Sequence, residues 1–219
     1  IVQLIGAPNG DNPKQIPDQD GTGFEFTDSN LFALDRIPGY DRIDSGSRMN
    51  YGIVLRADGP DIGENSFTFG QSYSFANPNG RNAAQGLGDR SSDYVGSVDV
   101  APLPQYCSGH YRFRYDHDTL EQRFAEVGAS VGPSLAKVTT DYIFLDKDTG
   151  TSTGKNFDQI GLGFASQMTQ HWSLRLGTKY DLNPKRDQGG ILSRGGGIRY
   201  QDECRSEEHT SELQSRGLI

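Results

Sequence analysis

The chain has 219 residues and a formal net charge of −8, and hydrophobic residues make up 33% of it. Its mean hydropathy is −0.65, and no stretch approaches the roughly 18 consecutive apolar residues of a membrane helix, which excludes a helical membrane protein. The acidic balance, without a basic stripe, indicates that nucleic acid is not a partner. Disorder is not expected either, because disordered chains contain few aromatic residues and this chain has 11 Phe, 10 Tyr and 1 Trp.

Alternation of apolar and polar residues predicts about nine strands. The first covers residues 48–58, and its apolar face comprises Met49, Tyr51, Ile53, Leu55 and Ala57. Such strict alternation is typical of a half-buried strand. Further strands are expected at residues 66–75, 93–102, 108–116, 125–131, 136–144, 160–164 and 172–182, with a weaker candidate at 190–201.

Turn sequences such as Asn77-Pro78-Asn79-Gly80 and Asn183-Pro184 separate these strands. The predicted fold is therefore all-β, an antiparallel meander. Strands of about nine to eleven residues are long enough to cross the hydrocarbon layer when tilted. Two architectures fit: a soluble β-sandwich, whose apolar faces pack together, and an outer-membrane β-barrel, whose apolar faces contact lipid and whose polar faces line a wet lumen.

Charges and aromatic residues favour the barrel. The charged residues that we expect to face the lumen are Arg48, Arg56, Arg112, Arg114, Arg175 and Lys179. Aromatic residues near strand ends, such as Trp172, Tyr180 and Tyr73, match the interfacial girdles of outer-membrane barrels. About nine strands is an awkward number for such a barrel, because single-chain bacterial barrels usually have an even count and must close.

Several short motifs, in order, resemble those of the LptD family, also called LPS-assembly or organic solvent tolerance proteins. The motifs are Asn30-Leu31-Phe32, Asp35 to Arg42, Asn50-Tyr51-Gly52, Gly70-Gln71-Ser72-Tyr73, Ser92 to Gly96, Tyr111 to Arg114, Tyr180-Asp181-Leu182 and Tyr200 to Cys204. The resemblance covers nearly all of residues 1–204. It implies that residues 1–204 are an inner portion of the C-terminal barrel domain of such a protein.

The resemblance further implies a place in the outer membrane of Gram-negative bacteria. There the chain would be part of the translocon that inserts lipopolysaccharide into the outer leaflet, without covalent chemistry. The implied partners are lipopolysaccharide, an LptE-like lipoprotein inside the barrel, membrane lipids, and periplasmic Lpt bridge proteins reached through a jellyroll domain outside this chain. A generic porin or uptake barrel and a soluble β-sandwich binding module remain the alternatives.

The search for catalytic chemistry is negative. His110 and His171 are predicted on the polar face and His117 in a turn, and none has metal-ligand spacing. No nucleophile motif or dinucleotide fingerprint occurs in a suitable context. We therefore expect no enzyme activity, no cofactor and no metal.

Three other segments carry expectations. The charged corner formed by Asp35, Arg36, Pro38, Gly39, Tyr40, Asp41 and Arg42 is predicted to be a tight turn that folds into the barrel mouth, with an ordinary solvated loop as the alternative. The resemblance places Cys204 where the family forms a disulfide to its periplasmic domain, and because the usual partner is not in this chain, Cys204 is expected to be unpaired here. Residues 205–215 resemble a translated sequencing adapter and show no strand alternation, so residues 205–219 are expected to be an artefactual or disordered tail.

Overall fold

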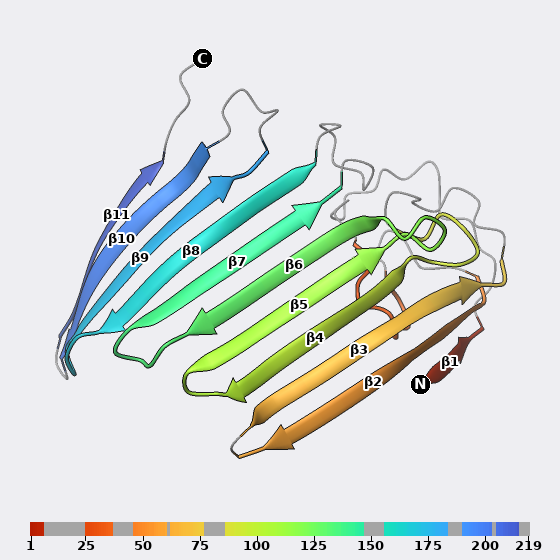
Figure 1. Ribbon diagram of the computed structural model, residues 1–219, viewed down its shortest axis with the longest axis horizontal. Coiled ribbons are helices and arrows are strands. Elements are labelled where there is room, and N and C mark those ends of the chain that lie inside the picture. The colour runs from red at the N-terminus through yellow and green to blue at the C-terminus, as the bar shows by residue number, and fades with distance from the viewer. Residues whose placement is uncertain are drawn as a thin grey trace.

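The computed structural model describes residues 1–6, 25–36, 46–60, 62–76, 86–146, 156–183 and 190–202, together with the backbone of 205–214. These residues form eleven strands in one antiparallel sheet, in the order β1 to β11 (Figure 1). No helix in this part of the chain is long and apolar enough to span a membrane.

The strands follow one another as a meander, so that each pairs with its neighbours in the sequence. Their bounds are β1 Val2–Ile5, β2 Arg48–Gly59, β3 Gly63–Ser74, β4 Tyr94–Leu103, β5 Cys107–Tyr115, β6 Gln122–Val131, β7 Lys137–Leu145, β8 Phe157–Gln167, β9 Trp172–Asp181, β10 Gly190–Asp202 and β11 Arg205–Gln214. The all-β meander predicted from the alternation is confirmed, and the nine predicted strands correspond to β2–β10.

Two strands differ from the expectation. β1 has only four residues, Val2–Ile5, too few for alternation to be recognised, and it pairs with Arg48–Tyr51 of β2. Residues Arg205–Gln214, for which no strand was expected, pair with β10 as β11. An edge strand has unpaired backbone N–H and C=O groups. These can pair with the segment that follows, regardless of the side chains of that segment. This pairing therefore says nothing about the origin of the tail, which stays a prediction.

The connections between strands differ in length at the two ends of the sheet (Figure 1). At one end they are short, spanning residues 60–62, 104–106, 132–136 and 168–171. At the other end they span residues 6–47, 75–93, 116–121, 146–156 and 182–189. We call the latter end the rim. Short turns at one end and longer loops at the other are typical of outer-membrane barrels.

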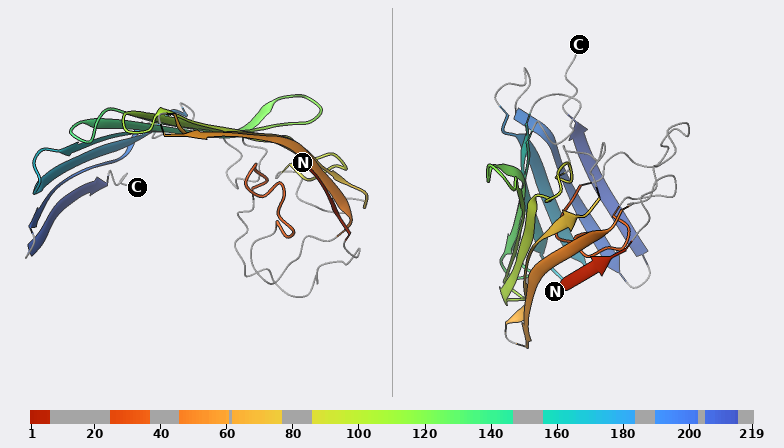
Figure 2. Two further views of the ribbon diagram at one scale, coloured as in Figure 1. Left: turned by 90° about the horizontal axis from the view of Figure 1, so that it is seen from below. Right: turned by 90° about the vertical axis from the view of Figure 1, so that its right-hand side faces the viewer.

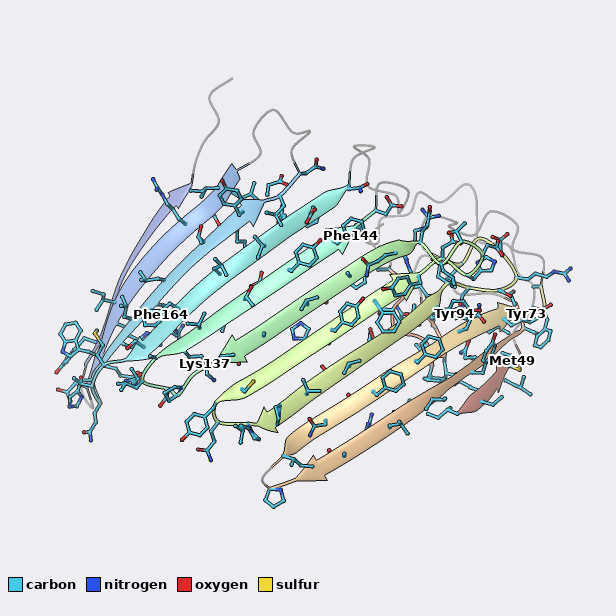
Figure 3. The ribbon with its side chains drawn as sticks, viewed as in Figure 1. Met49, Tyr73, Tyr94, Lys137, Phe144 and Phe164 are labelled. Atoms are coloured by element: carbon cyan, nitrogen blue, oxygen red, sulfur yellow. The ribbon has the colours of Figure 1, made fainter. Side chains whose placement is uncertain are left out.

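The sheet is strongly curved, with a convex and a concave face (Figure 2). The aromatic residues Tyr73, Tyr94, Phe144 and Phe164 all lie on the convex face (Figure 3). Ile53 and Phe69 form a cross-strand pair on the same face. They are 55% and 36% exposed, respectively.

Burial is inverted relative to a soluble protein. Among the described residues the buried hydrophobic side chains are few: Phe26, Leu31, Val95 and Ala125. Buried polar and charged side chains outnumber them and include Arg36, Arg48, Asn50, Ser72, Asp93, Ser97, Arg114 and Asp181. No second layer covers the apolar convex face in the described part of the chain, as a β-sandwich would require. One sheet with unjoined edges β1 and β11 is what part of an unclosed β-barrel looks like.

Candidate functional site

Residues 25–36 fold back against the concave face of the sheet near β2–β5 (Figure 2). We call them the inner segment. Asn30 organises it locally, because its side chain accepts a hydrogen bond from the backbone N–H of Thr27 (3.0 Å) and donates one to the carbonyl of Glu25 (2.7 Å). These two hydrogen bonds fold the first part of the inner segment into a compact turn.

A small apolar cluster fixes the inner segment to the sheet. Phe26, Leu31 and Val95 have no exposed surface, and Phe32 and Leu87 pack against them. Gly70 of β3 makes this contact possible, because a Cβ at this position would lie 2.6 Å from Cδ2 of Leu31. A side chain at position 70 would push Leu31 away from the sheet.

Two buried arginines attach the inner segment to β2 and β3. Arg48, which is fully buried, donates hydrogen bonds to the carbonyl oxygens of Ala33 and Leu34. Arg36 lies over the ring of Phe26, at 5.4 Å from its centroid, and donates to Oγ of Ser72 (3.2 Å). Burying a guanidinium is costly unless its N–H groups are paired, so these contacts fix where the inner segment can lie.

Arg114 of β5 makes a close ion pair with the inner segment. Its side chain is 1% exposed and donates to Oε2 of Glu25 at 2.8 Å, while its Nε lies 3.5 Å from Oδ2 of Asp93. Burial raises the pKa of Glu25 and that of Asp93, and the positive charge of Arg114 offsets this only in part. One buried cation thus lies between two carboxylates of high proton affinity.

A second charge cluster holds the rim turn between β5 and β6. Arg123 donates to Asp146 (2.8 Å) and to Asp116 (3.0 Å). Asp116 also accepts hydrogen bonds from the backbone N–H groups of Thr119 (2.9 Å) and Asp118 (3.0 Å). These donors, that of Thr119 first, hold the pKa of Asp116 well below its ordinary value. The rim turn is therefore tied to the end of β7 through charged hydrogen bonds.

All six charged residues that were predicted to face the lumen lie on the concave face. The register of the paired strands places these residues on one side of the sheet: Arg48, Arg56, Arg112, Arg114, Arg175 and Lys179. They have different surroundings, because the inner segment covers Arg48 and Arg114, whereas Arg56, Arg175 and Lys179 are exposed. Whether this face lines a closed lumen stays a prediction.

The predicted corner is only partly described. Asp35 and Arg36 end the inner segment, whereas Pro38, Gly39, Tyr40, Asp41 and Arg42 lie outside the described residues, as does Cys204. Sequence reasoning missed Glu25 and Asp93, the partners of Arg114. Glu25 is 89 positions away from Arg114 along the chain, and no local pattern marks such a pair.

Removing the cation between the two carboxylates will loosen the inner segment. We expect Arg114→Met to lower the free energy of opening of residues 25–36 by about 3 kcal/mol, because it leaves the half-buried carboxylate of Glu25 and the buried carboxylate of Asp93 without their cation. Amide hydrogen exchange in the complete protein measures this quantity. Arg112→Met is the matched control: it lies on the same strand and face, its side chain is 44% exposed, and its pair with Glu126 at 3.6 Å contributes at most about 1 kcal/mol. Equal effects of the two substitutions would contradict the assigned role of Arg114.

The raised pKa values predict a pH dependence for the inner segment. The docked segment binds protons more tightly than the undocked one, so its stability is greatest below the ordinary carboxyl pKa values, 4.5 for Glu25 and 3.8 for Asp93. The stability falls as the pH rises through the raised pKa values. Hydrogen exchange from pH 4 to 7, corrected for intrinsic rates, will show this slope, and Glu25→Gln will flatten it. Stability that instead increases with pH would mean that the attraction to Arg114 outweighs burial.

Comparisons with known proteins agree with this architecture. A sequence model of the LptD family, described as LPS transport system D, matches residues 1–172. A curated protein from Saccharophagus degradans (strain 2-40), named LPS-assembly protein LptD, is 25% identical over an alignment of 200 residues, and the match covers 82% of this chain. The chain spans 22% of the length of that relative. Since the family model covers well over half of the residues, this chain belongs to the LptD family.

Proposed function

We propose that the chain forms part of the wall of an outer-membrane β-barrel that inserts lipopolysaccharide into the outer leaflet, and that it does so without covalent chemistry. The observation that carries this proposal is the inverted sheet: a polar concave face that buries arginines, beneath an apolar convex face, in a chain of the LptD family. A wet lumen on one side and lipid on the other account for both faces.

Aromatic residues on the convex face support a membrane orientation. At the rim end, Tyr94 stacks on Phe69 with ring centroids 5.9 Å apart. At the end with short turns, Trp172 packs against Tyr200 at 4.9 Å. Aromatic residues at both ends of an apolar band are typical of barrels that cross a membrane, and the longer loops then lie at the cell surface.

The inner segment has a role of its own in this proposal. It lies on the face that would line the lumen and is held there by Arg36, Arg48 and Arg114. We propose that it narrows the path of lipopolysaccharide near the cell surface, and that the adjoining corner, through Arg42, contributes to the same constriction. An LptE-like lipoprotein would occupy the remaining lumen, and periplasmic Lpt proteins would deliver lipopolysaccharide through a jellyroll domain outside this chain.

A pair of substitutions at one depth tests the orientation of the two faces. Leu162 of β8 is 50% exposed on the convex face, and Thr139 of β7 pairs with the adjacent Gly163 on the concave face. We expect Leu162→Arg to destabilise the complete protein in lipid bilayers by about 2–4 kcal/mol, because it places a charge in the hydrocarbon layer. Thr139→Arg will cost far less because it faces water. Urea unfolding in vesicles measures both, and equal costs would argue against a lipid-facing convex face.

Depletion of the complete protein tests the function itself. In cells that stop making it, newly synthesised lipopolysaccharide will fail to reach the cell surface, as measured with an enzyme that modifies only surface-exposed lipopolysaccharide. Re-expression of the wild type will restore it, whereas substitution of Arg36 together with Arg42 will raise outer-membrane permeability to bulky antibiotics. A passive porin predicts another outcome: reduced uptake of small solutes with normal surface lipopolysaccharide. Unchanged permeability in the double variant would remove the role proposed for the inner segment.

A further inference from the structure

Three potential metal ligands meet at the rim of the sheet, beside the pair formed by Arg114 and Asp93. They are Asp89, from the connection between β3 and β4, and His117 and Asp118, from the turn between β5 and β6. One ligand atom from each residue lies within 4.8 Å of the other two. Two connections that are separate in the sequence thus bring one imidazole and two carboxylates together.

A buried carboxylate lies beside the imidazole. Nδ1 of His117 lies 3.8 Å from Oδ1 of Asp93, whose side chain is 9% exposed and pairs on its other oxygen with Arg114. The opposite ring nitrogen, Nε2, lies 3.4 Å from Oδ2 of Asp118. A histidine with one nitrogen toward a fixed carboxylate and the other toward further oxygen ligands has the arrangement found around protein-bound metals, where the outer carboxylate sets the ring orientation.

Both connections are fixed to the sheet, so the three ligands do not depend on each other for their positions. The backbone N–H of Ser74, at the end of β3, donates to the carbonyl of Arg90 (2.7 Å), and that of Asp93 donates to the carbonyl of Gly86 (2.9 Å). The turn that carries His117 and Asp118 is held by Asp116 and Arg123, as described above. Asp89 approaches His117 because neighbouring strands position both connections.

The charge balance also favours a cation. Two arginines near this site are engaged with other carboxylates, Arg114 with Glu25 and Arg123 with Asp116 and Asp146, while Arg90 directly follows Asp89 in the same connection. Asp89 and Asp118 add two further negative charges at exposed positions beside His117. A divalent ion would offset their mutual repulsion.

We propose that Asp89, His117 and Asp118 bind a divalent transition-metal ion of the zinc class, with Asp93 as the carboxylate that orients His117. One imidazole and two carboxylates are a ligand set that Zn²⁺ accepts, with water completing the coordination, whereas Mg²⁺ and Ca²⁺ prefer oxygen ligands alone. The ion joins the β3–β4 connection to the β5–β6 turn and closes this part of the rim. The ligand spacing in the sequence did not predict the site, because Asp89 lies on a different connection from the other two residues.

To test the proposal, the complete, detergent-purified protein is first treated with a chelator and then titrated with metal ions. We expect Zn²⁺ to bind by calorimetry, and Co²⁺ at the same site to give the visible absorption of a nitrogen- and oxygen-ligated ion. His117→Ala and, separately, Asp118→Asn will each weaken Zn²⁺ binding at least about tenfold. Zn²⁺ will also slow hydrogen exchange in residues 86–93 and 116–121 of the wild type, but not in the His117→Ala variant.

The matched control is His171→Ala. His171 is exposed and lies in a short turn at the opposite end of the sheet, so its removal should leave Zn²⁺ affinity unchanged. Three results would each overturn the proposal: equal affinities of the His117→Ala variant and the wild type, exchange at the two connections that does not respond to Zn²⁺, or binding of Ca²⁺ in preference to Zn²⁺. If His117→Ala disturbs folding, Asp118→Asn decides, because it keeps the size of the side chain at an exposed position.

Discussion

Pairing of the polar groups on the concave face is the constraint on which the rest of this structure depends. Arg48 and Arg114 are almost completely removed from solvent, and an unpaired guanidinium in such a position would be strongly destabilising. The inner segment supplies what they need: backbone carbonyls for Arg48 and the Glu25 carboxylate for Arg114. Buried ion pairs contribute little net stability, but they strongly disfavour alternative placements of the chain. The position of the inner segment is therefore set more by its charges than by its small apolar cluster.

The same constraint explains why one face of the sheet is polar and the other apolar. A single curved sheet has no second layer in which to bury its apolar side chains, so Ile53, Leu162 and their neighbours need an apolar environment outside the protein. A buried polar residue of the convex face can be satisfied within the sheet. Gln71, for example, accepts a hydrogen bond from the hydroxyl of Tyr51 and donates one to the carbonyl of Ser92 (2.8 Å). Satisfying such groups within the sheet keeps the apolar surface continuous.

Alternation predicted the strands because one face of this sheet is apolar and the other polar, so that apolar and polar residues alternate along each strand. It failed for β1, which is too short, and for β11, whose pairing rests on backbone groups that all residues share. The contacts of the inner segment could not be predicted, because residues 25–36 have no period and their partner Arg114 lies four strands further along the chain. The arginines that were expected to share one face do lie together on the concave face, and their exposure to a lumen stays a prediction. The sequence indicated which face these arginines share, but not which of them the inner segment covers.

The order of strands in this sheet also has a consequence for assembly. Each strand pairs only with its neighbours in the chain, so the sheet can grow hairpin by hairpin from local contacts, which are the fastest to form. The contact between Glu25 and Arg114 is of another kind, since it joins residues 89 positions apart and needs β5 in place before it can exist. The inner segment can therefore complete its contacts with the wall only after β2–β5 have paired.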